Sequence, residues 1–143
     1  MNIYQRNYKK LCTIFDIEKN RCTESYFKYK SPGNKNLYIE YFGSSFSSHY
    51  HIEVSHFYLV NGDLVADPTY EIEIDEDLET AEVVAYQSLS SYLSVYNIMR
   101  TNENGEDTEI KEYLNQCLEA WLDEIIERGY KLAPGDREIE EIK

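Results

Sequence analysis

The feature that most constrains the fold is a long hairpin pattern in the middle of the chain. Residues 49–75 read HYHIEVSHFYLV, then NG, then DLVADPTYEIEID. Apolar and polar side chains alternate along both arms, which is the period of a strand with one buried face. The Asn61-Gly62 pair between the arms favours a tight turn with positive φ. The pattern therefore predicts two antiparallel strands that share one apolar face.

Two registers compete for this hairpin. A two-residue turn places Leu59 opposite Leu64, but it mixes apolar positions of one strand with polar positions of the other. A three-residue turn places Val60 opposite Leu64 and avoids this mixing. We favour the three-residue turn because it gathers one apolar face, made of Tyr50, Ile52, Val54, Tyr58, Val60, Leu64, Ala66, Tyr70, Ile72 and Ile74.

The opposite face of the hairpin is polar in the favoured register. It sets His49 across from Asp75 and His51 across from Glu73. It also opposes Glu53 to Glu71, which is unfavourable for like charges. Pro68 cannot donate a hydrogen bond to a neighbouring strand, so this part of the hairpin is expected at a sheet edge or at a bulge.

Shorter patterns predict the remaining elements. Apolar residues at spacings of three and four predict helices over 3–15, 88–100 and 110–126, and alternating or aromatic-rich runs predict strands over 26–30, 37–42 and 82–86. Asp107 or Thr108 is expected to cap the last helix at its start and Gly129 at its end. Trp121 is expected to pack from this helix onto the sheet.

These elements predict an α+β fold. An antiparallel meander sheet of about five strands should pack against an N-terminal helix and a long C-terminal amphipathic helix. A chain of 143 residues is the size of one ordinary domain. We expect residues 1–135 to form that domain and residues 136–143 to form an acidic, frayed tail.

Charge is unevenly distributed along the chain. The net charge is -13, and residues 1–70 hold 8 basic and 7 acidic side chains whereas residues 71–143 hold 6 and 20. The densest stretch contains Glu71, Glu73, Asp75, Glu76, Asp77, Glu79 and Glu82. Such a surface repels nucleic acid and membrane phosphates, and it attracts basic protein surfaces. Direct binding to nucleic acid is therefore not expected, and solubility alone is the competing explanation of the acidic surface.

The cysteines and the N-terminal sequence indicate a cytoplasmic protein. Cys12, Cys22 and Cys117 are odd in number and lack a C-x-x-C pattern, so reduced thiols are expected in place of disulfides or a zinc ribbon. The N-terminal sequence MNIYQRNYKK has no apolar segment of the kind found in secretory signals. The chain has no apolar run long enough to cross a bilayer, and no membrane association is expected.

The hairpin also carries a family resemblance. The run HFYLVNGDLVADPTYEIEID, continued by AYQSLSSYLSVYN, resembles a family of small uncharacterised proteins carried by phages, plasmids and conjugative elements of Gram-positive bacteria. The shared N-G-D-L-x-x-D-P core consists here of Asn61, Gly62, Asp63, Leu64, Asp67 and Pro68. The resemblance covers His56 to Asn97. It implies an origin in mobile elements and implies no catalytic residue.

A metal site is the main chemical alternative. His49 and His51 lie on one face of a strand, with Glu53 beyond them and Glu73 and Asp75 across the hairpin. These side chains are possible ligands of a divalent cation. Gly43 followed by His49 and His51 also copies the opening of the cupin metal motif. The Glu and the later His that complete that motif are absent, so a solvated face with His–carboxylate pairs is favoured and no cofactor is predicted.

We therefore predict a non-enzymatic binding protein. It would come from a phage or mobile element and inhibit a host nucleic-acid-binding defence effector, such as a CRISPR nuclease, as an anti-CRISPR protein or DNA mimic does. The predicted contact is the acidic stretch from Glu71 to Glu82. The alternative is an accessory domain with a small-ligand or metal site near His49, His51 and Glu73, with or without catalytic activity.

Overall fold

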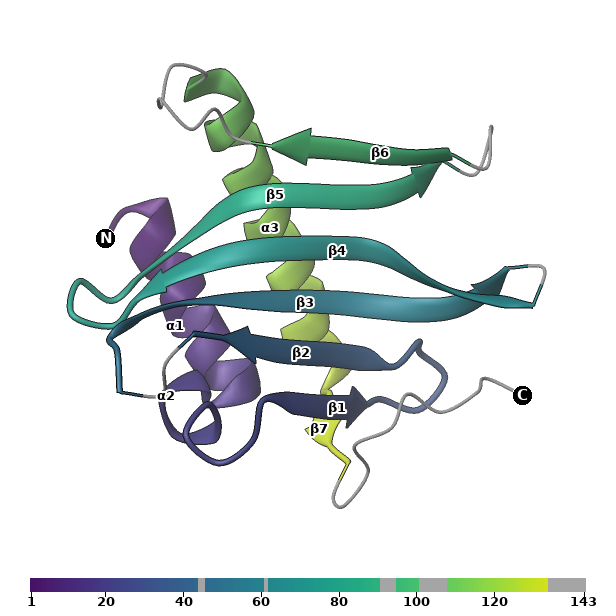
Figure 1. The fold of residues 1–143 in the computed structure, drawn as a ribbon, viewed down its shortest axis with the longest axis horizontal. Helices are drawn as coiled ribbons and strands as arrows, with labels where there is room; N and C mark the ends of the chain where they lie inside the picture. The colour runs from purple at the N-terminus through teal and green to yellow at the C-terminus, as the bar shows by residue number, and fades with distance from the viewer. Residues whose placement is uncertain (44–45, 61, 91–94, 101–107, 134–143) are drawn as a thin grey trace.

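The computed structural model describes residues 1–43, 46–60, 62–90, 95–100 and 108–133. The helices are α1 (Ile3–Phe15), α2 (Ile17–Asn20) and α3 (Thr108–Arg128), and the strands are β1 (Tyr26–Lys30), β2 (Leu37–Phe42), β3 (His49–Val60), β4 (Asp63–Asp75), β5 (Thr80–Ser90), β6 (Val95–Arg100) and β7 (Lys131–Leu132). Within the described residues, seven antiparallel strands form one sheet in the order β6-β5-β4-β3-β2-β1-β7. Figure 1 shows α1 and α3 side by side behind this sheet. The α+β class is therefore as predicted, and the sheet is wider than expected.

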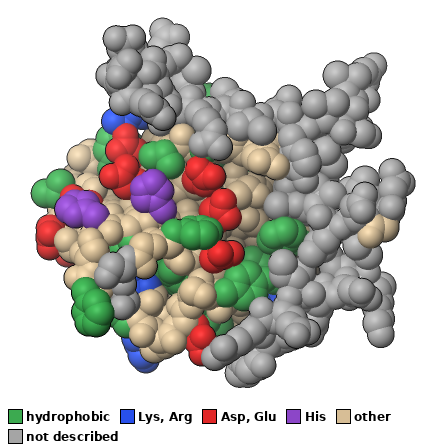
Figure 2. Space-filling model, in the orientation of Figure 1, with side chains coloured by type: hydrophobic (Ala, Val, Ile, Leu, Met, Phe, Trp, Pro, Cys, Tyr) green, Lys and Arg blue, Asp and Glu red, His purple; other side chains and the backbone are tan. Residues whose placement is uncertain are grey.

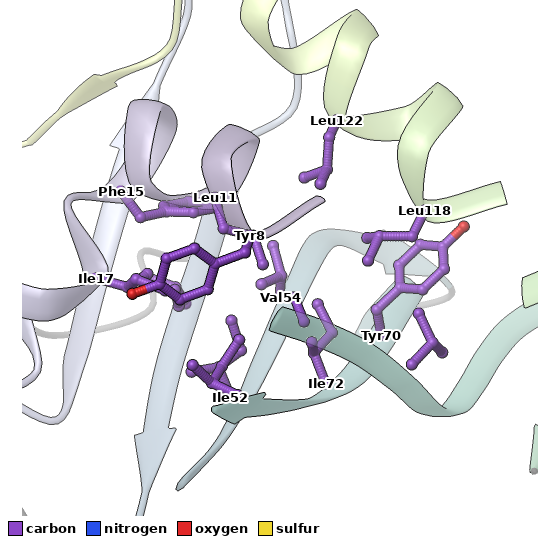
Figure 3. Packing of buried hydrophobic residues seen from close by; sticks show 14 of the residues in the cluster. Tyr8, Leu11, Phe15, Ile17, Ile52, Val54, Tyr70, Ile72, Leu118 and Leu122 are labelled. Carbon is purple, nitrogen blue, oxygen red and sulfur yellow. The ribbon is translucent and has the colours of Figure 1, made fainter. Parts of the chain in front are cut away.

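The N-terminal helix forms where its apolar spacing predicts it. A capping box starts it, because the Asn2 side chain accepts a hydrogen bond from the Gln5 backbone N–H and the Gln5 side chain accepts one from the Asn2 N–H. Helix α1 ends at Phe15, and the next residue, Asp16, has a left-handed φ of 49°. Its buried side chains, with those of α3, build the core over one sheet face (Figure 3).

The C-terminal helix forms where it was predicted, and it extends two residues further at each end than the apolar spacing over 110–126. Leu114, Leu118 and Leu122 are buried against the sheet. Gly129, with a φ of 67°, follows its last residue. The Trp121 ring lies 5.1 Å from the Tyr70 ring and 5.2 Å from the His56 ring, so Trp121 packs onto the sheet as predicted.

One acid of α3, Glu119, contacts the neighbouring helix α1. Glu119 accepts hydrogen bonds from Arg6 at 2.8 Å and from Lys10 at 3.0 Å, and both cations belong to α1. The hydrogen bond from Arg6 is the largest cause that lowers the pKa of Glu119 to about 2. These ion pairs hold the two helices together at the rim of their interface.

The hairpin combines the two competing registers. Close to the turn Leu59 pairs with Leu64, as in a two-residue turn, so the predicted pairing of Val60 with Leu64 is wrong. Beyond Ser55 the partners are Val54 with Tyr70 and so on to His49 with Asp75, which is the register of the three-residue turn. A bulge reconciles the two, because β4 has one more residue than β3 between these segments, at Asp67 and Pro68.

Pro68 forms part of this bulge, where its missing N–H removes no regular ladder hydrogen bond. The edge expectation also agrees with the ladder, because β5 pairs with β4 only from Thr69 to Asp75 and the segment before Thr69 pairs, among the described strands, with β3 alone. The extra residue shifts the register so that the apolar side chains of the distal segment reach the core. Ile52, Ile72 and Ile74 are fully buried, as the favoured register predicts.

The predicted short helix over 88–100 is wrong. Strand β5 continues to Ser90, and residues 95–100 form β6, which pairs with β5 from Ala85 to Ser90. The segment VYNIMR is rich in β-branched and aromatic residues, and the unpaired edge of β5 offers it backbone partners. Pairing in the sheet therefore overrides the helical spacing of the apolar residues. The predicted loop over 101–106 and the predicted tail over 136–143 lie outside the described residues.

Candidate interaction surface

The sheet face opposite α1 and α3 carries no helix among the described residues (Figure 1). Since side chains alternate along a strand, the neighbours of the buried isoleucines point to this side. We call it the open face and define it by Glu40, Phe42, His49, His51, Glu53, Glu71, Glu73, Asp75 and Glu82. Figure 2 looks onto this side of the molecule and shows acidic and histidine side chains close together.

A row of three glutamates crosses the centre of the open face. Glu40 of β2 pairs with Glu53 of β3, and Glu53 pairs with Glu71 of β4. Adjacent strands lie about 4.8 Å apart, so the three carboxylates are direct neighbours. We call Glu40, Glu53 and Glu71 the acid row. Like charges opposite one another destabilise a sheet, so the fold carries a local electrostatic cost here.

The ionisation of Glu53 reflects this cost. Burial raises the pKa of its carboxyl group, and the charges of Glu71 and Glu40 raise it further. A hydrogen bond between the Glu53 and Glu71 carboxyl groups acts in the same direction. None of the Lys or Arg side chains in the described part of the chain forms an ion pair with Glu53. A cation supplied by a partner would relieve the repulsion.

A depression of about 480 Å³ lies beside the acid row. Its lining consists of Phe42, Gly43, His49, Tyr50, His51, Ile52, Glu53 and Glu71. The Phe42 side chain is 42% exposed, so a wide apolar surface borders the two carboxyl groups. The volume lies in the range of small-ligand sites, which are about 300–1,000 Å³. An aromatic ring next to carboxylates provides the chemistry for binding an organic cation.

The histidines predicted for this face lie where the register places them. His49 Nε2 lies 2.7 Å from an Asp75 carboxylate oxygen, and His51 pairs in the ladder with Glu73. The Leu78 backbone N–H is the largest cause of a lowered pKa at Asp75, and His49 contributes as well. The favoured interpretation of His–carboxylate pairs therefore accounts for His49 and Asp75.

Glu76, one of the acids predicted for the contact surface, has a structural role in the fold. Its carboxylate accepts two hydrogen bonds from Arg21, at 2.8 and 3.0 Å, and one from the Tyr50 hydroxyl at 2.6 Å. Burial alone would raise the pKa of Glu76, but these hydrogen bonds outweigh burial and lower it. The Arg21 guanidinium also lies 4.4 Å from the Tyr50 ring centre. Neutralising Glu76 would therefore weaken the fold.

The other predicted acids divide between the open face and the turn before β5. Glu71, Glu73 and Asp75 share the open face with Glu82, which forms an ion pair with Lys111 at 2.5 Å. Asp77 and Glu79 are exposed in the turn, where Asp77 accepts a hydrogen bond from the Ser48 hydroxyl at 2.7 Å.

The sequence prediction missed Glu40 and Phe42 and gave Glu53 only a passing role. Both missed residues belong to β2, whose register against β3 no local pattern specifies. The alternating run LYIEYF already placed Glu40 and Phe42 on one face of a strand. Only the pairing of β2 with β3 shows that this face continues the polar face of the hairpin.

Across the described ranges, no three His, Cys, Asp or Glu side chains are grouped to hold a metal ion.

One family model matches the chain over most of its length. No curated protein and no solved structure matches the chain. No helix in the described residues is both long and apolar enough to cross a bilayer. The matching model is described as a domain of unknown function, DUF6908, and it covers residues 6–131, from α1 to β7. The chain therefore belongs to the DUF6908 family.

Proposed function

We propose that the protein is a non-enzymatic binding protein that uses its open face to cover a basic surface of another protein. The target class is a nucleic-acid-binding defence protein, such as a CRISPR nuclease, whose basic surface ordinarily holds nucleic acid phosphates. A protein that occupies such a surface competes with the nucleic acid and inhibits the target.

The acid row is the observation that carries this proposal. Glu40, Glu53 and Glu71 occupy neighbouring positions on three adjacent strands. Burial and the charges of Glu71 and Glu40 raise the pKa of Glu53, so ionisation of this carboxyl group is unfavourable in the free protein. An unfavourable arrangement of charges at one place on a regular sheet is typical of a binding site, because a partner supplies the compensation.

The depression suggests how one basic side chain would bind. A guanidinium group is planar, stacks on aromatic rings and forms paired hydrogen bonds with carboxylates. Phe42 offers a ring, and Glu53 and Glu71 offer the carboxylates. An arginine from the partner would therefore fill the depression, and Glu73 and Asp75 would lie close to further cations along β4.

The charge distribution supports a macromolecular partner. The 20 acidic side chains of residues 71–143 outnumber the 6 basic ones, so attraction extends well beyond one pocket. The resemblance of the hairpin to proteins of mobile elements supports the choice of a defence protein as target. The same charge opposes direct contact with DNA or RNA.

The test measures binding of a fluorescein-labelled hexa-arginine peptide by anisotropy at low salt. The double substitution Glu53→Gln and Glu71→Gln should weaken binding at least about tenfold, since two charge-assisted contacts are lost. The matched control is Glu112→Gln with Glu127→Gln, which removes the same charge from exposed positions of α3. The control should change the affinity less than about twofold.

Equal losses of affinity in both double variants would contradict the proposal, because binding would then depend on net charge alone. The target class is tested separately with a CRISPR nuclease bound to labelled duplex DNA. The wild-type protein should release the DNA in a gel-shift assay, and the Glu53→Gln, Glu71→Gln variant should not. Retention of DNA at saturating wild-type protein would exclude that nuclease as a target.

A second candidate function rests on the size of the depression. A cavity of about 480 Å³ can hold a small organic cation without any protein partner. In that case free arginine or a polyamine would bind about as tightly as hexa-arginine and would raise the melting temperature. Weak binding of free arginine with strong binding of the peptide favours the macromolecular partner.

A further inference from the structure

Two loops meet at the end of the sheet where β3 begins and β4 ends (left side of Figure 1). The Glu76 backbone N–H donates a hydrogen bond to the Ser48 carbonyl oxygen at 2.9 Å. The Ser48 hydroxyl donates another to the Asp77 carboxylate at 2.7 Å. We call residues 46–48 and 76–79, which these contacts join, the loop tip.

The loop tip presents two large apolar side chains to water. Phe46 is 97% exposed and Leu78 is 66% exposed. Single exposed apolar residues are common on soluble proteins. These two, however, come from adjacent loops that are hydrogen-bonded to each other, and they lie at the end of the sheet that contains the depression.

The part of the tip that carries Leu78 is held in place before any partner arrives. The Leu78 N–H donates to an Asp75 side-chain oxygen at 3.0 Å, and the paired hydrogen bonds from Arg21 fix Glu76. Glu79 completes the turn with a left-handed φ of 54°. A prearranged loop loses little conformational freedom on binding, which favours affinity. A turn that only connects two strands would ordinarily have a polar residue at the position of Leu78.

We propose that the loop tip is an apolar anchor that inserts Phe46 and Leu78 into hollows of a basic protein surface. The inference rests on the proposed function and extends the open face to its loop end. Charge identifies the occupant, because Asp77 and Glu79 are exposed beside the two apolar side chains. They would repel a second copy of this acidic chain or an anionic membrane, and they would attract a cationic rim.

The experiment compares two labelled peptides with equal charge. One is hexa-arginine, and the other has the same six arginines interrupted by one tryptophan and one leucine. The double substitution Phe46→Ser and Leu78→Ser should weaken binding of the apolar-containing peptide at least about tenfold, since buried apolar anchors dominate interface affinity. The affinity of the same double variant for hexa-arginine should change less than about twofold. Unchanged affinity for the apolar-containing peptide overturns the inference.

Two controls separate the possible failures. Tyr113→Ser with Ile126→Ser removes two exposed apolar side chains of α3 and should leave both affinities unchanged. If Glu53→Gln with Glu71→Gln weakens hexa-arginine binding while the loop-tip variant has no effect, the proposed function survives and the anchor does not. If wild-type protein dimerises in light scattering and Phe46→Ser with Leu78→Ser abolishes the dimer, a second copy is the occupant and the inference is overturned.

Discussion

At the scale of single residues, Glu53 has an ionisation that opposes folding at neutral pH. Its raised pKa means that the folded state favours the protonated carboxyl group more than the unfolded state does. The resulting cost is absent below the ordinary glutamate pKa of about 4.3 and is fully present above the raised pKa. The protein therefore loses stability as the pH rises from the ordinary glutamate pKa to the raised pKa of Glu53.

Glu53→Gln should consequently stabilise the protein at pH 7. Glutamine cannot ionise, so it removes the repulsion from Glu40 and Glu71, and we expect a gain of up to about 1 kcal/mol. Thermal unfolding at several pH values measures the gain, which should vanish near pH 4 where Glu53 itself is protonated. Glu112→Gln, at an exposed position of α3, should show no such gain. A Glu53→Gln variant that is less stable than wild type at pH 7 would mean that Glu53 is already compensated.

At the scale of elements, a buried amide joins the helices to an irregular point of the sheet. The ladder between β4 and β5 shifts register between Glu71 and Ile72. Close to this point, the Val83 N–H donates to the Asn115 side-chain oxygen at 3.0 Å. The Asn7 side chain of α1 donates to the Asn115 backbone oxygen at 3.2 Å. Asn115 is fully buried, and it therefore links α1, α3 and β5 through polar contacts inside an apolar core.

Asn115→Leu should destabilise the protein by about 1–3 kcal/mol, because the Val83 N–H loses its buried acceptor. The neighbouring Gln116 carries the same amide group at an exposed position of the same helix, and it provides a matched control. Gln116→Leu should change the free energy of unfolding by less than about 0.5 kcal/mol. Urea denaturation of both variants makes the comparison. Equal effects of the two substitutions would show that leucine on α3, and not the lost acceptor, determines the outcome.

Elements with strong local patterns could be predicted from the sequence, and elements that depend on distant partners could not. Helix α1 and the core of α3 follow from apolar spacing and caps. The hairpin contained both correct registers, but only the bulge at Pro68 shows where one gives way to the other. Strand β6 was missed because the free edge of β5 outweighs its local spacing. The acid row escaped prediction for a similar reason, since Glu40 joins Glu53 only through the pairing of β2 with β3.

At the scale of the whole molecule, excess negative charge opposes folding and favours binding of basic partners. The chain has 27 acidic and 14 basic side chains. Some acids are compensated locally, as Glu119 is by Arg6 and Lys10. The remaining acids repel one another through water, and dissolved salt screens this repulsion.

Sodium chloride should therefore act on stability and on binding in opposite directions. At about 10 mM salt the screening length is about 30 Å, and at about 150 mM it is about 8 Å. Over this range the melting temperature should rise by a few degrees, because weaker self-repulsion adds on the order of 1 kcal/mol. The affinity for hexa-arginine should fall over the same range, and the fall should be shallower for Glu53→Gln with Glu71→Gln. Potassium chloride should give the same result, which separates screening from ion-specific effects.

A melting temperature that falls with salt would contradict this prediction. It would show that local ion pairs such as Arg6–Glu119 and Arg21–Glu76 outweigh the repulsion from the net charge. The acidic surface would then be a stabilising network.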